Sequence, residues 1–297
     1  MNAVTGVFSY TGRAIAEELI ARGEQVKTLS REDAPDDPLR DKIEFAPLRF
    51  DATLAESLSG VQTLYNTYWV RFKRGAVSFD DAVANTVALF EAARRAGVRR
   101  IVHVSVANAD RADDLPYFRG KHQIEAWLAA SGLLHAIVRP TLIFGANDIL
   151  INNIAWIARR TPVFVMPGRG DYHVQPVSLR DTARLCVDAP DGSTTDAAGP
   201  ETLTFRRLVE LVSDATGSRC SVVSGPPGLG LGLIRVAGLL LRDTVVTTDE
   251  LEGLSRSLLT TAGLPTGTET VEAWLTECGP VLGRSYVSER ARNFSEK

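Results

Sequence analysis

Short apolar runs alternate with amphipathic stretches over the first half of the chain. Six runs have the length and the residue content of buried strands: Ala3–Thr5, Gln25–Leu29, Ile43–Ala46, Val61–Tyr65, Arg100–Val104 and His135–Arg139. Between them, apolar residues recur with a helical period over Gly12–Arg22, Phe79–Ala96 and Tyr117–Ala130. Each helix leads into a strand within a few residues, which is typical of parallel strands joined by crossover helices. The pattern predicts an α/β protein built on a doubly wound parallel sheet.

After Pro140 this alternation ends and helical patterns dominate. They cover Asn147–Arg160, Ser178–Val187, Phe205–Thr216, Val271–Cys278 and a polar tail around Tyr286–Arg292. We therefore expect two domains. The first spans residues 1–145, with its sheet completed by about residues 173–200. A smaller, mostly helical lobe takes residues 146–172 and 201–297, and we expect it to receive the substrate.

Composition narrows the class of protein without changing the predicted fold. With 44% hydrophobic and 23% charged residues, the chain has enough apolar material for a packed core. Its net charge of -3 leaves no excess of cations to follow a phosphate backbone, so a nucleic-acid partner is disfavoured. The most apolar stretch, Gly228–Leu241, contains Arg235 and is shorter than the roughly 20 residues that cross a bilayer. It predicts a buried or lid-like helix rather than stable membrane insertion.

The cysteines and histidines show no ligand pattern. Cys186, Cys220 and Cys278 have neither metal-ligand spacing nor the even number of a disulfide framework, which suits a reducing compartment. A strand and a glycine turn begin almost at once, with no secretory signal before them. We therefore expect a cytoplasmic protein. The histidines lack ligand spacing, so we expect no metal site.

The sharpest motif is the turn between the first strand and the first helix. Gly6 permits a tight turn, and Gly12 lets the helix pack closely against the strand. The N–H groups at the start of the helix then face a pyrophosphate, whose charge the helix dipole favours. This is the arrangement of a Rossmann dinucleotide site. The turn residues that we expect to bind the cofactor are Gly6, Phe8, Ser9, Tyr10, Thr11 and Gly12.

The end of the second strand predicts which nicotinamide cofactor is preferred. Arg31 offers a cation to a 2′-phosphate, which favours NADP(H), whereas Glu32 beside it would accept the ribose 2′-hydroxyl of NAD(H). NADP(H) is the stronger prediction, and NAD(H) stays open. Asp51, just after the third strand, has two interpretations of nearly equal weight, a contact to the adenine or a simple helix cap.

Tyr117 and Lys121 are four residues apart, so the phenol and the ammonium share one face of a helix. A lysine charge lowers the pKa of a nearby phenol and so prepares it for proton transfer to or from a substrate hydroxyl. The pair follows the strand that ends at Val104-Ser105, where the chain reaches the carboxyl edge of the sheet. This position, more than the spacing, indicates a catalytic pair.

Together these features resemble the short-chain dehydrogenase/reductase superfamily, in its extended and atypical branch of NAD(P)-dependent epimerase/dehydratases and NmrA-like proteins. The motifs that carry the resemblance span nearly the whole chain: Thr5–Gly12, Tyr117 with Lys121, Arg139–Thr141 with Gly145, and Gln175–Val177 with Asp181. The C-terminal part is similar to a bacterial epimerase-like subgroup, on the segments Leu264–Gly267, Trp274–Leu275 and Leu282–Tyr286.

The resemblance implies catalytic roles for particular residues. Tyr117 would be the acid/base and Lys121 its helper, which also holds the nicotinamide ribose. Ser105 would polarise the substrate oxygen. Asn108 is an alternative donor, because Ala107 occupies the position where the family's serine usually lies.

It also implies that the chain passes the cofactor at two further strand ends. Asn66 and Thr67 would lie along its ribose, and Pro140 and Thr141 would line the nicotinamide side. The aromatic residues after Thr67 either floor a substrate pocket or cover the edge of the sheet, with even support for the two interpretations.

Three functions remain, in this order. The first is an NAD(P)-dependent oxidoreductase or epimerase/dehydratase that acts on a hydroxyl or carbonyl carbon of a small-molecule substrate. The second is a non-catalytic, NmrA-like redox sensor, which the uncertain serine position supports. The third is an accessory protein with a Rossmann body. The family resemblance makes a homodimer an open alternative.

Overall fold

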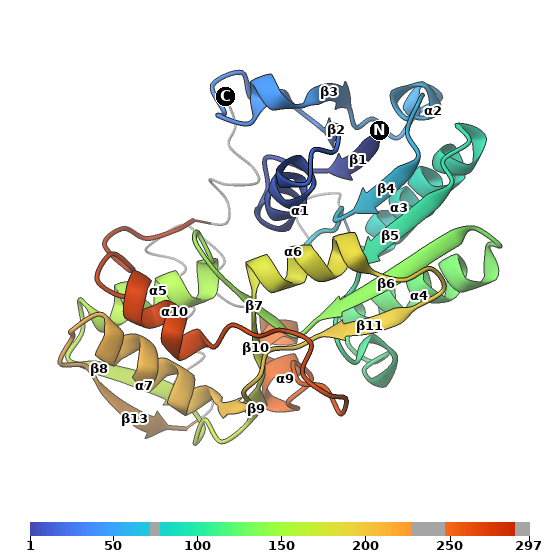
Figure 1. The fold of residues 1–297 in the computed structure, drawn as a ribbon. Coiled ribbons are helices and arrows are strands. Elements are labelled where there is room, and N and C mark those ends of the chain that lie inside the picture. Colours follow the sequence, from blue (N-terminus) through green and yellow to red (C-terminus); the bar gives the residue numbers. More distant parts are fainter. Residues whose placement is uncertain (72–77, 227–246, 289–297) are drawn as a thin grey trace. The chain divides into compact units, whose positions relative to one another are not determined.

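The computed structural model describes residues 1–71, 78–226 and 247–288, and the chain divides into two compact units (Figure 1). Unit 1 comprises Met1–Pro140 and Leu179–Ala197, and unit 2 comprises Thr141–Ser178 and Ala198–Lys297. The predicted apolar helix at Gly228–Leu241 lies outside the described residues. So do residues 289–292 of the predicted tail helix, whose described part, residues 286–288, is not helical.

The described part of unit 1 is built on a seven-stranded sheet. Its strands, in spatial order, are β11 (Thr194–Ala197), β6 (Leu134–Pro140), β5 (Arg100–Val104), β4 (Thr63–Asn66), β1 (Asn2–Thr5), β2 (Val26–Ser30) and β3 (Glu44–Pro47). All neighbouring pairs are parallel. The order reverses between β1 and β4, which is the switch point where doubly wound sheets bind ligands. The predicted fold class is confirmed.

Helices cover both faces of this sheet. On one face α1 (Tyr10–Ala21) packs against α6 (Leu179–Asp188), and on the other α3 (Phe79–Arg95) packs against α4 (Pro116–Ala130) (Figure 1). Shorter elements complete the unit: η1 (Arg40–Lys42), α2 (Leu54–Ser57) and η2 (Ala109–Arg111). Because helices cover both faces, the side chains on both sides of the central strands β1, β4 and β5 are largely buried.

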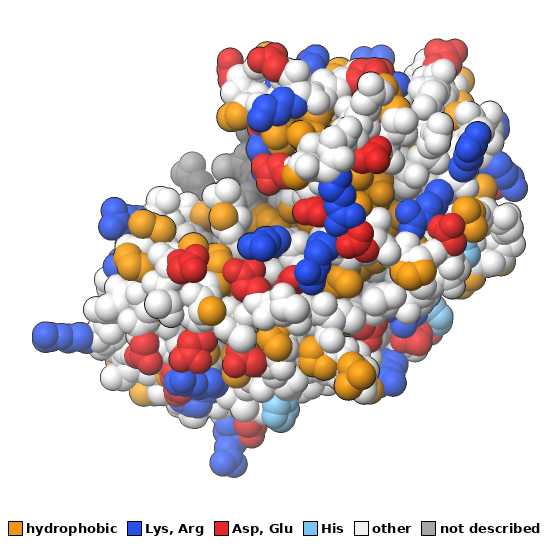
Figure 2. Space-filling model, in the orientation of Figure 1, with side chains coloured by type: hydrophobic (Ala, Val, Ile, Leu, Met, Phe, Trp, Pro, Cys, Tyr) orange, Lys and Arg blue, Asp and Glu red, His pale blue; other side chains and the backbone are white. Residues whose placement is uncertain are grey.

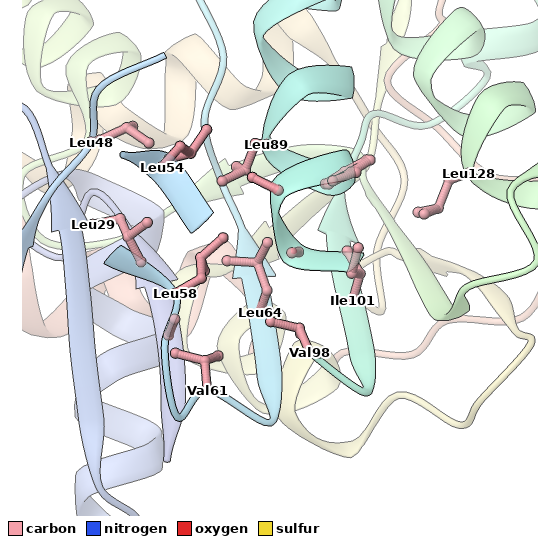
Figure 3. Close-up of a cluster of buried hydrophobic side chains, with 14 of the residues drawn as sticks. Leu29, Leu48, Leu54, Leu58, Val61, Leu64, Leu89, Val98, Ile101 and Leu128 are labelled. Atoms are coloured by element: carbon pink, nitrogen blue, oxygen red, sulfur yellow. The ribbon is translucent and has the colours of Figure 1, made fainter. Parts of the chain in front are cut away.

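The core between the sheet and the α3/α4 layer is aliphatic (Figure 3). Leu64 on β4 and Ile101 on β5 meet Leu89 of α3 and Leu128 of α4, and each of these four side chains is at most 1% exposed. Burial of one such side chain stabilises the fold by about 1.5–3 kcal/mol. The core therefore gives the strand ends a rigid base, on which the candidate site is built.

Unit 2 combines helices with short paired strands. Its helices are α5 (Ile149–Ala158), α7 (Phe205–Ala215), α9 (Thr248–Ser255) and α10 (Val271–Cys278). Its strands pair two by two: β7 (Leu142–Phe144) with β10 (Pro176–Ser178), β8 (Val163–Pro167) with β13 (Ser221–Gly225), and β9 (His173–Val174) with β12 (Leu203–Thr204). The helices predicted at Asn147–Arg160, Phe205–Thr216 and Val271–Cys278 are present as α5, α7 and α10, and α9 and the three strand pairs are additional to the prediction.

The segment after α10 is fixed to α5 through its backbone. Arg159 donates to the carbonyl of Leu282 at 2.6 Å. Asn153 bonds both backbone groups of Val287, each at 3.0 Å. A β-carbon on Gly283 would lie 2.4 Å from the backbone of Ala155, so only glycine allows this close approach.

Charged side chains of both signs are interspersed on the face drawn in Figure 2, without a broad area of one sign. This agrees with the near-neutral net charge of the chain. Within the described ranges, no helix has the length and apolar content needed to span a membrane.

Candidate functional site

The turn after β1 is shaped by two glycines. Gly6 has a φ of +67°, and its amide donates to the carbonyl of Leu29 on β2 at 2.8 Å. A β-carbon on Gly12 would lie 2.3 Å from the carbonyl oxygen of Gly6, well inside van der Waals contact. The start of α1 is thereby drawn against the end of β1, which is the close approach that a pyrophosphate-binding turn requires.

Ser9 stands at the N-terminus of α1 without capping it. Its hydroxyl donates to the carbonyl of Gly6 at 2.6 Å, and no side chain caps the helix. The first N–H groups of a helix have no intrahelical partners. Since the first turn also carries no acidic residue, its positive dipole end can take an anion.

A polar network joins the ends of β1, β4 and β5. The Thr5 hydroxyl accepts from the amide of Thr67 at 2.7 Å, and the Thr67 hydroxyl donates to the carbonyl of Thr5 at 2.6 Å. Asn66 is fully buried, and its amide nitrogen lies 3.0 Å from Nδ1 of His103. The network therefore fixes Asn66 and Thr67 beside the glycine turn, at the switch point of the sheet.

The ends of β2 and β3 bring two arginines to one edge. Arg31 follows Ser30 and Arg49 follows Leu48, whose amide donates to the carbonyl of Ser30 at 2.8 Å. Both arginines are exposed, and neither has an ion pair or side-chain hydrogen bond within the described chain. Sequence reasoning identified Arg31 and missed Arg49, which becomes relevant only once β2 and β3 are paired.

Asp51 is occupied locally. Its carboxylate accepts from the amide of Thr53 at 2.8 Å and from the Thr53 hydroxyl at 2.6 Å. These bonds, aided by the charge of Arg49, hold the pKa of the Asp51 carboxyl below its usual value. Both bonds are local to the turn before α2 (Leu54–Ser57), whose N-cap residue is Thr53, so Asp51 does not cap that helix; the adenine contact stays a prediction. The other cation near the turn, Arg13, forms an ion pair with Asp37.

Lys121 is buried on α4, with a side chain that is 3% exposed. Its Nζ donates to the carbonyl of Val104 at 2.8 Å and lies 4.7 Å from the centre of the Trp69 ring. Burial lowers the pKa of this amine to about 7, against an opposing effect of Glu125. Glu125 itself is held by both donor groups of Arg139, so its charge is already compensated.

Tyr117 belongs to an aromatic cluster, which we define as Trp69, Phe79 and Tyr117. The Trp69 ring stacks on Phe79 at 6.1 Å between centroids and meets the edge of Tyr117 at 5.9 Å. A β-carbon on Gly120 would lie 2.8 Å from Cη2 of Trp69. The indole therefore occupies a notch that only glycine leaves in α4, and it lies beside Lys121.

The hydroxyls of Ser105 and Thr141 differ in whether they form a hydrogen bond within the described chain. The Ser105 hydroxyl is buried with no hydrogen-bond partner among the described residues. Its amide donates to the carbonyl of Val138 at 2.7 Å, which fixes the strand end. The Thr141 hydroxyl, in contrast, donates to the carbonyl of Gln175 within unit 2. Pro140 is buried, and its carbonyl accepts from Ala107 at 2.9 Å.

His103 lies on β5, beneath the polar network and against the aromatic ring of Phe90. The ring is fully buried and meets the edge of Phe90 at 5.8 Å. Burial, followed by the nearby Lys121 charge, lowers the pKa of His103 well below its ordinary value. The imidazole is therefore neutral at physiological pH, and it serves to orient Asn66.

Comparison with known families agrees with this geometry. Residues 8–189 match the model of an NAD(P)H-binding family, and the chain belongs to that family. The predicted Rossmann fold and the predicted NAD(P)-binding class are confirmed by this match and by the fold of solved structures. Binding of NAD(P)H is thus the established property of this fold.

Two solved structures illustrate the fold. The Citrobacter sp. triphenylmethane reductase complexed with NADP(H) is 17% identical, with a TM-score of 0.76 and coverage of 94% of this chain and 99% of that one. The NADPH-dependent quinone oxidoreductase from Escherichia coli is 22% identical, with a TM-score of 0.74 and coverage of 93% and 99%.

Relatives by sequence have diverse names. Subunit 9 of the NADH dehydrogenase (ubiquinone) 1 alpha subcomplex from Arabidopsis thaliana is 26% identical over 228 residues, covering 71% of this chain and 56% of that protein. Sterol demethylase protein B from Methylococcus capsulatus is 37% identical over 108 residues, covering 34% and 33%. The chain thus spans about half or less of the length of these curated relatives.

Proposed function

We propose that this protein is an NADPH-dependent oxidoreductase that reduces a carbonyl carbon of a small-molecule substrate, with Tyr117 as proton donor and Lys121 as its helper. When bound, the reduced nicotinamide supplies a hydride to the carbonyl carbon, while the Tyr117 hydroxyl supplies a proton to the oxygen. An epimerase or dehydratase would use the same pair with a transient hydride transfer. The observation that carries the proposal is the turn in which Gly12 approaches Gly6 at the start of α1.

The cofactor would lie along the switch point of the sheet. Its pyrophosphate would meet the N-terminus of α1, within the residues Gly6, Phe8, Ser9, Tyr10, Thr11 and Gly12. Asn66 and Thr67 would follow its ribose. For the nicotinamide side, Pro140 and Thr141 are assigned by resemblance alone.

The preference for NADPH rests on charge. Arg31 and Arg49 follow adjacent strands and form no ion pair within the described chain, although the charge of Arg49 acts on Asp51. A 2′-phosphate could therefore pair with both arginines without breaking an existing ion pair. The buried Ser105 hydroxyl, which lacks a partner in the described chain, supports its assignment as the donor to the substrate oxygen.

A non-catalytic dinucleotide sensor is the second candidate. Lys121 is 3% exposed and bonded to the Val104 carbonyl beneath Trp69, so the family's usual helper is covered in this structure. One similar protein, from Cyanidium caldarium, is named a photosystem II assembly factor, which supports a role in binding without turnover.

Calorimetric titration with NADPH and with NADH, followed by a carbonyl screen, tests the proposal. We expect tighter binding of NADPH, and NADPH oxidation with at least one ketone, aldehyde or quinone. Tyr117→Phe should retain NADPH binding and lose at least about 100-fold in turnover. Binding without turnover across the screen would favour the non-catalytic sensor. If neither NADPH nor NADH binds, both candidate functions are refuted.

A further inference from the structure

Trp69 contacts both members of the proposed catalytic pair and one further aromatic ring. Its ring stacks on Phe79, meets the edge of Tyr117, and lies over the Lys121 amine at 4.7 Å. All of these residues belong to unit 1, on β4–α3 and α4. An ammonium over an indole face makes a cation–π contact, which favours the charged form of Lys121 and opposes the larger effect of burial.

Gly120 is explained by this contact. It lies in the middle of α4, where glycine costs about 1 kcal/mol relative to alanine. A β-carbon there would lie 2.8 Å from Cη2 and 3.2 Å from Cζ2 of Trp69, and 3.3 Å from Val83. The helix therefore gives up intrinsic stability at a position where a side chain would displace the indole.

We propose that Trp69 is a positioning residue for the Tyr117–Lys121 pair: seated in the notch at Gly120, its indole excludes water from the Lys121 amine and holds that amine on the Val104 carbonyl. An ammonium has three donors to satisfy. Lys121 has one acceptor within the described chain, the Val104 carbonyl, besides the indole face. This surrounding suits an amine that gives up its proton readily.

The neighbouring titratable groups do not replace the indole in this role. On α4, Glu125 is neutralised by Arg139, and Tyr117 lies one turn before Lys121. On β5, His103 is buried and its pKa is lowered, so it is uncharged at neutral pH. Desolvation, for which Trp69 is the adjacent large side chain, is the main cause that lowers the pKa of Lys121 to about 7.

A consequence follows for the proposed reaction, on which this inference rests. A charged Lys121 lowers the pKa of Tyr117, and a neutral Lys121 does not. Trp69 would therefore set the pH at which Lys121 loses its proton and stops lowering the pKa of Tyr117. Removing the indole would admit water and move the proton loss of Lys121 toward higher pH.

Titration of Lys121 by NMR tests the role of Trp69 without cofactor or substrate. Only five lysines occur in the chain, so carbon-13 labelling at the lysine ε position gives a simple spectrum, and Lys121→Met identifies the Lys121 resonance. Lys27, which is buried but paired with Glu44 at 2.8 Å, is the internal reference. Because the free protein is used, failure of NADPH binding would leave this result intact.

Three variants separate the indole from general packing. Trp69→Ala and Gly120→Ala should each raise the midpoint of the Lys121 titration by about one pH unit or more, a tenfold change in the neutral fraction at a given pH. Gly120→Ala displaces the indole without deleting it, and the higher helix propensity of alanine offsets part of the cost of the added methyl group. Trp69→Phe, which keeps a ring, should shift the midpoint less.

The matched control is Trp127→Phe, on the same helix, where the indole packs against Phe90 at 5.9 Å. It should leave the Lys121 midpoint unchanged. The inference is overturned if Lys121 titrates in wild type at the ordinary value of a lysine, or if its midpoint is the same in wild type, Trp69→Ala and Gly120→Ala.

Discussion

Gly12 faces the carbonyl oxygen of Gly6 so closely that a β-carbon at position 12 would lie 2.3 Å from that oxygen and 2.8 Å from the carbonyl oxygen of Thr5. Both oxygens are backbone atoms, so no side-chain rotation can relieve the clash. Position 12 accepts only glycine, because the first turn of α1 must meet the end of β1. Folding and the proposed cofactor site therefore depend on the same contact.

Gly12→Ala should damage both properties. We expect a loss of about 1–3 kcal/mol in the free energy of unfolding, the usual cost of overpacking, together with at least a tenfold weaker affinity for NADPH. Urea unfolding and calorimetry measure these two quantities. Gly263→Ala is the control, since a β-carbon there meets only the Thr261 hydroxyl at 3.4 Å, and it should change neither. Equal affinity in Gly12→Ala and wild type would contradict the placement of the pyrophosphate.

Arg31 and Arg49 should share the recognition of a 2′-phosphate. Replacing either with alanine should weaken NADPH binding about tenfold, or 1.4 kcal/mol, and leave NADH binding nearly unchanged. The loss should shrink as salt is added, because both side chains are exposed. Arg99→Ala, an exposed arginine at the amino end of β5, is the matched control. Parallel losses for NADPH and NADH would show that the arginines do not read the phosphate.

Much of unit 1 was predictable because its signals are local. Apolar runs and helical periods gave six strands and three helices close to their observed bounds, and Gly6 and Gly12 marked the turn. The strand β11, with the polar sequence Thr194–Ala197, and the pairs formed by β7 and β9 have no such pattern. Their pairing is set by distant chain segments, which periodicity does not register.

The features of the candidate site that the sequence did not predict also depend on contacts between distant chain segments. Gly120 could only be interpreted as a glycine inside a helix, because the indole that fills its notch is 51 residues earlier in the chain. Likewise, the spacing of Tyr117 and Lys121 predicted their common helix but neither the burial of Lys121 nor its bond to Val104. Long-range packing, rather than local pattern, decides how these groups are covered.

Removing one partner of the ion pair between Glu125 and Arg139 should lower the stability of the protein strongly. The Glu125 side chain is 5% exposed, and both Nε and a terminal nitrogen of Arg139 donate to it. Arg139→Met leaves a buried carboxylate without its partner, so we expect a loss of about 3–5 kcal/mol in unfolding free energy. The exposed pair of Arg256 and Glu252 provides the control, because Arg256→Met should cost less than about 1 kcal/mol. Similar costs for the two variants would contradict a buried, structural ion pair.

Lys121 should make the stability of the protein depend on pH in a direction that can be derived. Its pKa is about 7 in the folded chain and about 10.4 in an unfolded one. Between these values the unfolded state binds more protons, so the free energy of unfolding rises with pH. Below pH 7 the folded protein carries the full cost of a desolvated ammonium, on the order of 4 kcal/mol.

Lys121→Met removes that ionisation while keeping a side chain of similar length. At pH 6 the variant avoids this desolvation cost but loses the hydrogen bond to Val104, which is worth about 1 kcal/mol. It should therefore be more stable than wild type by about 2–3 kcal/mol. The advantage should decline steadily from pH 7 upward and vanish or reverse near pH 10, as wild-type Lys121 becomes neutral in both states. Urea unfolding at a series of pH values measures this difference directly.

Lys27→Met, which instead breaks the ion pair with Glu44, is the control and should not stabilise the protein at pH 6. A Lys121→Met variant whose stability parallels that of wild type at every pH would mean that Lys121 pays no desolvation cost, and the indole could then not be acting on it.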